Sequence, residues 1–153
     1  MKIRTLFAAV AFATAPAIIS APAAHADKAP VYTAWNSNVA VQGYDPVAYF
    51  TEREPVKGSK DYSTDYNGAE FRFASAENLA TFEADPEAYA PQYGGYCAWA
   101  VAQDKTAKGS AQHWAIVDGK LYLNFNKKIQ STWNEDREGF ITSADANWPT
   151  VLQ

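Results

Sequence analysis

The stretch Tyr62-Ser-Thr-Asp-Tyr-Asn-Gly-Ala-Glu-Phe-Arg-Phe-Ala-Ser75 contains the strongest structural signal in the chain. Asn67-Gly68 tolerates the positive φ angles of a tight turn, and the residues on either side are suited to strands, which predicts a β-hairpin. Phe71 and Phe73 alternate onto one face of the second strand. Ser75 stands where an N-cap residue begins a helix. A hairpin that runs into a capped helix is typical of a mixed α and β domain.

A second hairpin is predicted around Asp118-Gly119, with Leu121, Leu123 and Phe125 facing one side of its second strand. No internal repeat is evident in the sequence. Two hairpins with several short helices indicate an α+β fold rather than a parallel α/β fold. The predicted elements before the second hairpin are a short helix at 46–50 capped by Asp45, a helix at 76–83, a turn at 86–89, a break at 91–95 and a small-residue helix or tight turn at 96–102. After it, a helix that follows Asn126 holds Ile129 and Trp133 and stops at Gly139, and a last helix runs to about Asn147.

Composition excludes several classes of protein. The chain has 153 residues, 48% of them hydrophobic and 20% charged, as expected for a soluble globular protein. With 13 Lys and Arg against 17 Asp and Glu, the net charge is -4, and no basic patch is evident, so we expect no nucleic acid partner. One cysteine excludes an internal disulfide framework.

The N-terminus is typical of a secretory leader. Lys2 and Arg4 precede the apolar stretch 6–19, and Ala24-His25-Ala26 is a small-x-small cleavage site. We interpret 1–26 as a signal peptide, which makes the mature chain periplasmic or secreted and free of the membrane. The alternative, an N-terminal membrane anchor, is disfavoured because the apolar stretch is shorter than the roughly 20 residues that span a bilayer.

The mature chain is expected to form one domain. Residues 27–38 show no clear period and are predicted to be a linker that docks through Trp35. Residues 39–149 hold all of the predicted strands and helices.

Three segments stand out together, namely 43–50 (GYDPVAYF), 66–75 (YNGAEFRFAS) and 82–89 (FEADPEAY). They resemble the YHS domain family, and the resemblance implies a small α+β domain over 39–149. Two further segments, 93–100 (YGGYCAWA) and 117–124 (VDGKLYLN), resemble a small secreted subfamily, some members of which carry selenocysteine where Cys97 stands.

The same resemblance disfavours one metal site. Metal-handling relatives carry cysteines after the Phe-x-Phe strand and in the first turn of the next helix. Here these positions hold Ala74, Ser75 and the pair Glu77-Asn78. We therefore expect no tight zinc site.

Cys97 is the candidate catalytic residue. Gly94-Gly95 permits a sharp turn just before a predicted helix start, where unpaired N–H groups favour a thiolate. We expect Cys97 to be partly reachable by solvent, with a pKa below the ordinary thiol value of about 8.5. The alternative is a buried thiol that acts as a small hydrophobe.

The first functional hypothesis is thiol redox chemistry. A lone thiol cannot close its own disulfide, so a sulfenic acid or mixed disulfide at Cys97 would need an external thiol or disulfide partner, with a small-molecule oxidant as substrate. No cofactor is required. His113 is the sole histidine outside the leader and is a candidate base.

Two other hypotheses stay open. Cys97 with His113 is a candidate ligand pair for a soft metal such as copper. The third hypothesis is a small-ligand or interaction module with an aromatic pocket over Cys97. The aromatic residues proposed to line that pocket are Tyr44, Tyr49, Tyr93, Tyr96 and Trp99.

The leader yields a direct test. Protein recovered from the medium or periplasm of an expressing bacterium should begin at Asp27, because cleavage follows Ala24-His25-Ala26. N-terminal sequencing checks this. Exported material that begins at Met1 would contradict the signal-peptide interpretation.

Overall fold

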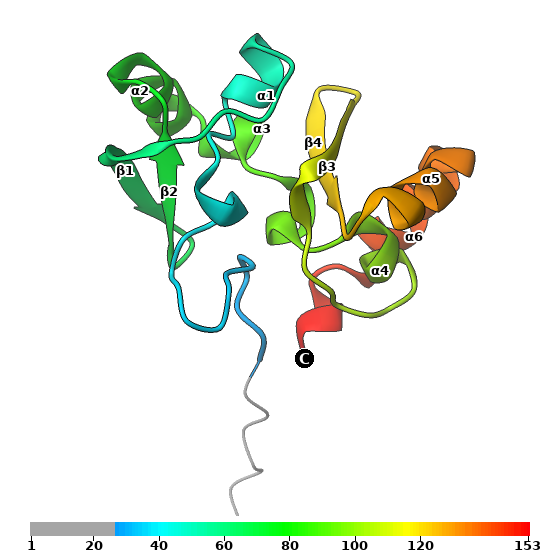
Figure 1. The fold of residues 1–153 in the computed structure, drawn as a ribbon. Helices are drawn as coiled ribbons and strands as arrows, with labels where there is room; N and C mark the ends of the chain where they lie inside the picture. Colours follow the sequence, from blue (N-terminus) through cyan, green and yellow to red (C-terminus); the bar gives the residue numbers. More distant parts are fainter. Residues whose placement is uncertain (1–26) are drawn as a thin grey trace, which may run out of the picture.

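The structure is a computed structural model that describes residues 27–153, so the predicted leader lies outside the described residues. It confirms the α+β class (Figure 1). The hairpin that decided the prediction is present, with Asn67 at φ 49° and Gly68 at φ 83° in its turn. The predicted cap is also present, since Ser75 Oγ accepts the Asn78 N–H at 3.1 Å.

Two halves of the chain contain the same elements in the same order (Figure 1). The first half contains η1 (Val41–Gly43), α1 (Ala48–Thr51), β1 (Ser59–Tyr66), β2 (Ala69–Phe73), α2 (Ala76–Ala84) and α3 (Pro86–Tyr89). The second half contains η2 (Gln92–Gly95), α4 (Ala98–Ala102), β3 (Ser110–Val117), β4 (Lys120–Asn124), α5 (Lys127–Glu135) and α6 (Arg137–Asn147), and η3 (Thr150–Leu152) follows it.

The halves are a structural repeat, which corrects the sequence reading that no repeat is evident. Each hairpin pairs antiparallel with a register shift near the start of its first strand, and β3 starts 51 residues after β1 (110 minus 59). Left-handed backbone recurs at matching positions, as in Gly43 (φ 80°) and Gly95 (φ 82°). The repeat is not apparent in the sequence because most of the corresponding side chains differ, as Phe82 and Trp133 do.

Each half packs its own core, and β4 lies between the two. Leu121 and Leu123 belong to the core of the first half, whereas Tyr122 belongs to that of the second. The strand is therefore buried on both faces. Leu121 and Leu123 face one side as predicted, but the prediction for Phe125 is wrong, because this residue follows the end of β4 and is 40% exposed.

Two side chains of the first half form hydrogen bonds to the backbone at the start of β3, the first strand of the second half. Gln42 accepts the Ala111 N–H at 2.7 Å and donates to Gly109 O at 3.0 Å. The buried Tyr49 hydroxyl donates to Ala111 O at 2.8 Å, and its ring contacts that of Trp114 edge to face. These contacts give the two halves a fixed relative position.

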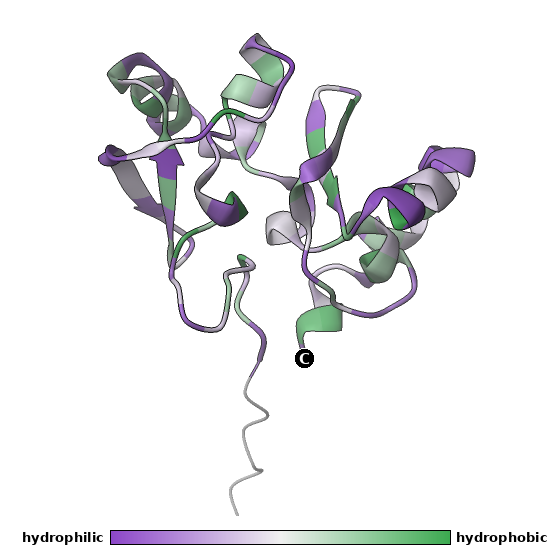
Figure 2. Cartoon of the chain, in the orientation of Figure 1, coloured by the Kyte–Doolittle hydropathy of each residue, from purple (hydrophilic) through white to green (hydrophobic). Residues whose placement is uncertain are grey.

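The predicted helix end at Gly139 is wrong. Helix α5 ends at Glu135, and Gly139 lies inside α6, where it donates its N–H to the Asp136 carboxylate at 3.0 Å. A Cβ on Gly139 would stand 2.2 Å from that carboxylate. The glycine thus makes room for a helix cap instead of stopping a helix. In Figure 2, α5 is largely hydrophilic, as suits a helix on the surface.

The N-terminal segment packs on the domain, but not through Trp35. Trp35 is 98% exposed, whereas Val31 is buried. The Tyr32 N–H donates to Gly94 O at 2.9 Å, and the Tyr96 hydroxyl donates to Ala29 O at 2.9 Å. Hydrogen bonds to the backbone of the segment, one of them from the Tyr96 hydroxyl, rather than contacts of the tryptophan hold it. Within the described residues, no helix has the length and apolar character needed to cross a membrane.

Buried tyrosines make the fold sensitive to alkali. Burial raises the pKa of Tyr49, of Tyr93 and of Tyr122, in the last case to about 12, whereas tyrosines of the unfolded chain ionise near pH 10. The unfolded state therefore releases these protons first. We expect the free energy of unfolding to be steady below about pH 10 and to fall as the pH rises toward 12.

Tyr49→Phe isolates one contribution. Near neutral pH it should cost about 1 kcal/mol, because Ala111 O loses its donor. Above about pH 10 the difference between wild type and variant should shrink by up to about 1.4 kcal/mol per pH unit. Urea unfolding followed by tryptophan fluorescence at both pH values checks this. A difference that stays constant with pH would contradict the argument.

Candidate functional site

Cys97 lies immediately before α4 and is its N-cap residue, as the sequence predicts. It forms a parallel bridge with Leu123 of β4, and its N–H donates to Ala107 O at 2.9 Å. These two contacts hold its backbone between β4 and the loop after α4. The thiol donates to Asn124 Oδ1 at 3.7 Å. The residue is 1% exposed.

The predicted exposure and pKa of Cys97 are therefore both wrong. Burial raises the pKa of the Cys97 thiol above its ordinary value, because the thiolate loses its hydration. Three backbone N–H groups oppose this rise, although they do not overcome it. They belong to Ala100, Phe125 and Trp99 and are called the thiol seat below. The helix start does favour the thiolate, but desolvation outweighs it.

The first half has the same seat with a carboxylate in it. Asp45 is 0% exposed. Its Oδ1 accepts the Val47 and Ala48 N–H groups at 2.8 and 3.3 Å, and its Oδ2 accepts the Ala74 N–H at 2.8 Å. The fourth donor is Asn78 Nδ2 at 2.7 Å. These four donors are called the carboxylate seat below.

The repeat relates the backbone positions of the two seats, although in the second half the Trp99 N–H donates to Asn124 Oδ1 rather than to the sulfur. The Asp45 N–H donates to Val56 O, as the Cys97 N–H donates to Ala107 O. The two N–H groups at the start of each helix correspond, and so do those that follow β2 and β4. The matching pairs are Val47 with Trp99, Ala48 with Ala100, and Ala74 with Phe125.

The fourth donor has no polar counterpart in the second half. Asn78, the third residue of α2, corresponds to Ile129, the third residue of α5. A pocket of about 190 Å³ lies beside the sulfur at this place. This thiol pocket is lined by Cys97, Trp99, Ala100, Ala107, Phe125 and Ile129.

Asn124 is a functional candidate that sequence reasoning missed. It is 0% exposed, and its Oδ1 accepts both the Cys97 thiol and the Trp99 N–H, the latter at 3.2 Å. Its Nδ2 is buried without a hydrogen-bond partner. Asn124 corresponds to the core residue Phe73, so a polar side chain at an apolar strand position is the signal that was available in the sequence.

The five aromatic residues predicted to surround Cys97 do not form one pocket. Of these five residues, only Trp99 lines the thiol pocket. Tyr49 is buried in the core of the first half, Tyr44 lies under the Lys57 ammonium 4.1 Å from its ring centroid, and Tyr96 contacts Trp148. Tyr93 lines a different cavity, described next.

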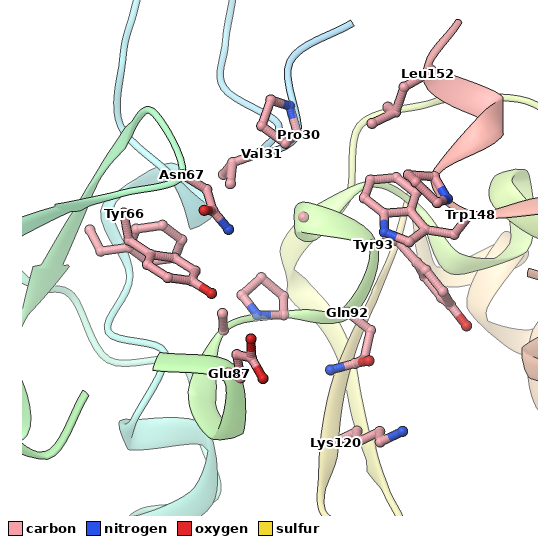
Figure 3. A pocket seen from close by; sticks show the side chains of 15 residues that line it. Pro30, Val31, Tyr66, Asn67, Glu87, Gln92, Tyr93, Lys120, Trp148 and Leu152 are labelled. Carbon is pink, nitrogen blue, oxygen red and sulfur yellow. The ribbon is translucent and has the colours of Figure 1, made fainter. Parts of the chain in front are cut away.

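A cleft of about 470 Å³ lies between the halves (Figure 3). Tyr66 and Asn67 approach it from the first hairpin, and Tyr93 and Trp148 form the opposite wall (Figure 3). Glu87 brings a carboxylate to the same space. No sequence motif pointed to this cleft, because its walls come from both halves and from both ends of the described chain.

His113 lies half-buried in β3, and no hydrogen bond joins it to Cys97 within the described residues. Within 27–153, no three side chains of the types His, Cys, Asp and Glu gather as metal ligands.

Comparison with known families matches the YHS domain model to residues 47–93. The match covers most of the first half, from just before α1, and ends within η2 of the second half, before Cys97, so it says nothing of the thiol seat. No curated protein and no solved structure matches the chain.

Removing the side chain from each seat should lower the free energy of unfolding by a different amount. Asp45→Ala leaves four donors without an acceptor and should lower the free energy of unfolding by about 3 kcal/mol or more. Cys97→Ala removes a neutral thiol from the matching place and should cost only about 1 kcal/mol. Urea unfolding of both variants checks this. Equal losses in the free energy of unfolding would contradict the expected difference between the carboxylate and the thiol.

Proposed function

We propose that this chain is an exported protein that carries out thiol redox chemistry at Cys97. The sulfur occupies the place that, in the other half of the same molecule, holds the buried carboxylate of Asp45 with its four hydrogen-bond donors. This observation supports the proposal more than any other. Backbone N–H groups have fixed positions, so their stabilisation of a negative sulfur or oxygen requires no reorganisation during the reaction.

The proposed reaction reduces a hydroperoxide. Deprotonated Sγ attacks the terminal oxygen of the hydroperoxide. A sulfur–oxygen bond forms, the oxygen–oxygen bond breaks, and the other oxygen leaves as an alcohol that takes up the proton released by the thiol. Sulfur is oxidised to a sulfenic acid and the peroxide is reduced.

An external thiol completes the cycle. It condenses with the sulfenic acid, releases water and forms a mixed disulfide with Cys97. A second thiol then attacks that disulfide, restores the Cys97 thiol and leaves as part of an external disulfide. An external partner is needed because the sequence contains one cysteine.

The raised pKa has a kinetic consequence. At neutral pH only a small fraction of Cys97 is thiolate, because burial favours the neutral thiol. The rate of reaction with an electrophile therefore rises with pH and continues to rise above the ordinary thiol pKa of about 8.5.

A second candidate function is binding of a small molecule without turnover. The cleft between the halves supports it, because its volume of about 470 Å³ lies within the roughly 300 to 1,000 Å³ typical of ligand pockets. Aromatic walls and the Glu87 carboxylate fit an organic ligand with a donor group. This site lies apart from the thiol pocket, since Cys97 does not line it.

Trapping of the sulfenic acid tests the redox proposal. Native protein treated with a hydroperoxide and a dimedone-type probe should gain one adduct on Cys97, and Cys97→Ser should gain none while its urea midpoint stays near that of wild type. Peptide mass mapping identifies Cys97 as the labelled residue, since it is the one cysteine in the sequence. No adduct on native protein, with labelling after unfolding, would identify Cys97 as a structural thiol and favour the second candidate function.

A further inference from the structure

The thiol pocket has almost entirely apolar walls. Besides Cys97, its lining residues are Trp99, Ala100, Ala107, Phe125 and Ile129. We infer, resting on the proposed redox function, that its substrate is an organic hydroperoxide whose apolar alkyl or aryl group fills this pocket. The hydroperoxide end would then face Sγ.

In the first half of the repeat, a polar side chain occupies the position that corresponds to the thiol pocket. There Asn78 Nδ2 donates to the Asp45 carboxylate, so the residue from the helix satisfies the buried group directly. Ile129 stands at that position in the second half and can donate nothing to Cys97. The sulfur thus faces an apolar space in place of a polar side chain.

The volume fits a small organic group. An apolar cavity of about 150 Å³ holds benzene, and the thiol pocket is larger, at about 190 Å³. An aryl or branched alkyl group gains free energy by leaving water for such walls. Hydrogen peroxide gains nothing comparable, and a charged peptide disulfide would have to lose its hydration.

Asn124 provides an independent indication of an oxygen ligand. Its Nδ2 is a fully buried donor without a partner, on the amide whose Oδ1 lies 3.7 Å from Sγ. A buried donor without a partner is unfavourable, because it has lost its hydration and gained no hydrogen bond. Asn124 itself does not line the pocket, but its amide contacts Sγ, so an oxygen carried on Sγ, as in a sulfenic acid, would bring an acceptor next to this unused donor. An alkyl halide or a disulfide brings no such oxygen.

Competition among oxidants tests the inference. The rate of dimedone adduct formation on Cys97 is measured for the full protein with cumene hydroperoxide, tert-butyl hydroperoxide and hydrogen peroxide, each relative to its rate with a small free thiol. We expect cumene hydroperoxide to be favoured over hydrogen peroxide by at least about tenfold. Ile129→Asn, which installs the residue of the first half, should reduce this preference to within about threefold.

Ile129→Val is the matched control, because it keeps the wall apolar and should retain the preference. If Ile129→Asn fails to fold, Ile129→Thr introduces a smaller polar group at the same place. Adducts with all three oxidants at equal relative rates, or a preference that neither polar variant changes, would overturn the substrate inference and leave the redox proposal standing. Absence of any adduct would overturn both.

Discussion

A carboxylate that solvent does not reach, that of Asp45, accepts hydrogen bonds from four donors. Burial of a charge is costly unless hydrogen bonds replace its hydration, and here the donors come from the start of α1, the end of β2 and the side chain of Asn78 on α2. One group thereby ties a helix, a hairpin and a second helix together. The arrangement of the first half depends on this contact, because removal of the acceptor leaves all four donors without a protein partner.

The second half keeps this arrangement and changes its chemistry. The backbone around Cys97 follows that around Asp45, including the hydrogen bond from its own N–H and the N–H groups that face its side chain. A thiol fills the place of a carboxylate, and Ile129 fills that of Asn78. Three backbone N–H positions correspond, of which that of Trp99 donates to Asn124 Oδ1, and a thiol with a raised pKa stands in place of the carboxylate. A structural role in one half and chemical reactivity in the other are therefore compatible with the same backbone.

The position of strand β4 between the two cores explains why solvent barely reaches Cys97. The strand separates two cores, with Leu121 and Leu123 toward the first and Tyr122 toward the second. Cys97 bridges to Leu123, so it lies where both halves exclude water. The same geometry buries Asn124, whose Oδ1 accepts the Cys97 thiol and the Trp99 N–H and whose Nδ2 has no acceptor. Access to the sulfur is thereby limited to the small apolar pocket.

Local signals in the sequence determined both hairpins, most helix starts and the place of Cys97 before α4, because turn residues and caps act over a few positions. They did not determine that Gly139 lies within a helix, since only the Asp136 cap explains it. The exposure and pKa of Cys97, the two-sided burial of β4 and the cleft between the halves were decided by tertiary structure. Each depends on segments distant in sequence, and a repeat with few shared side chains becomes visible only when the backbone hydrogen bonds are compared.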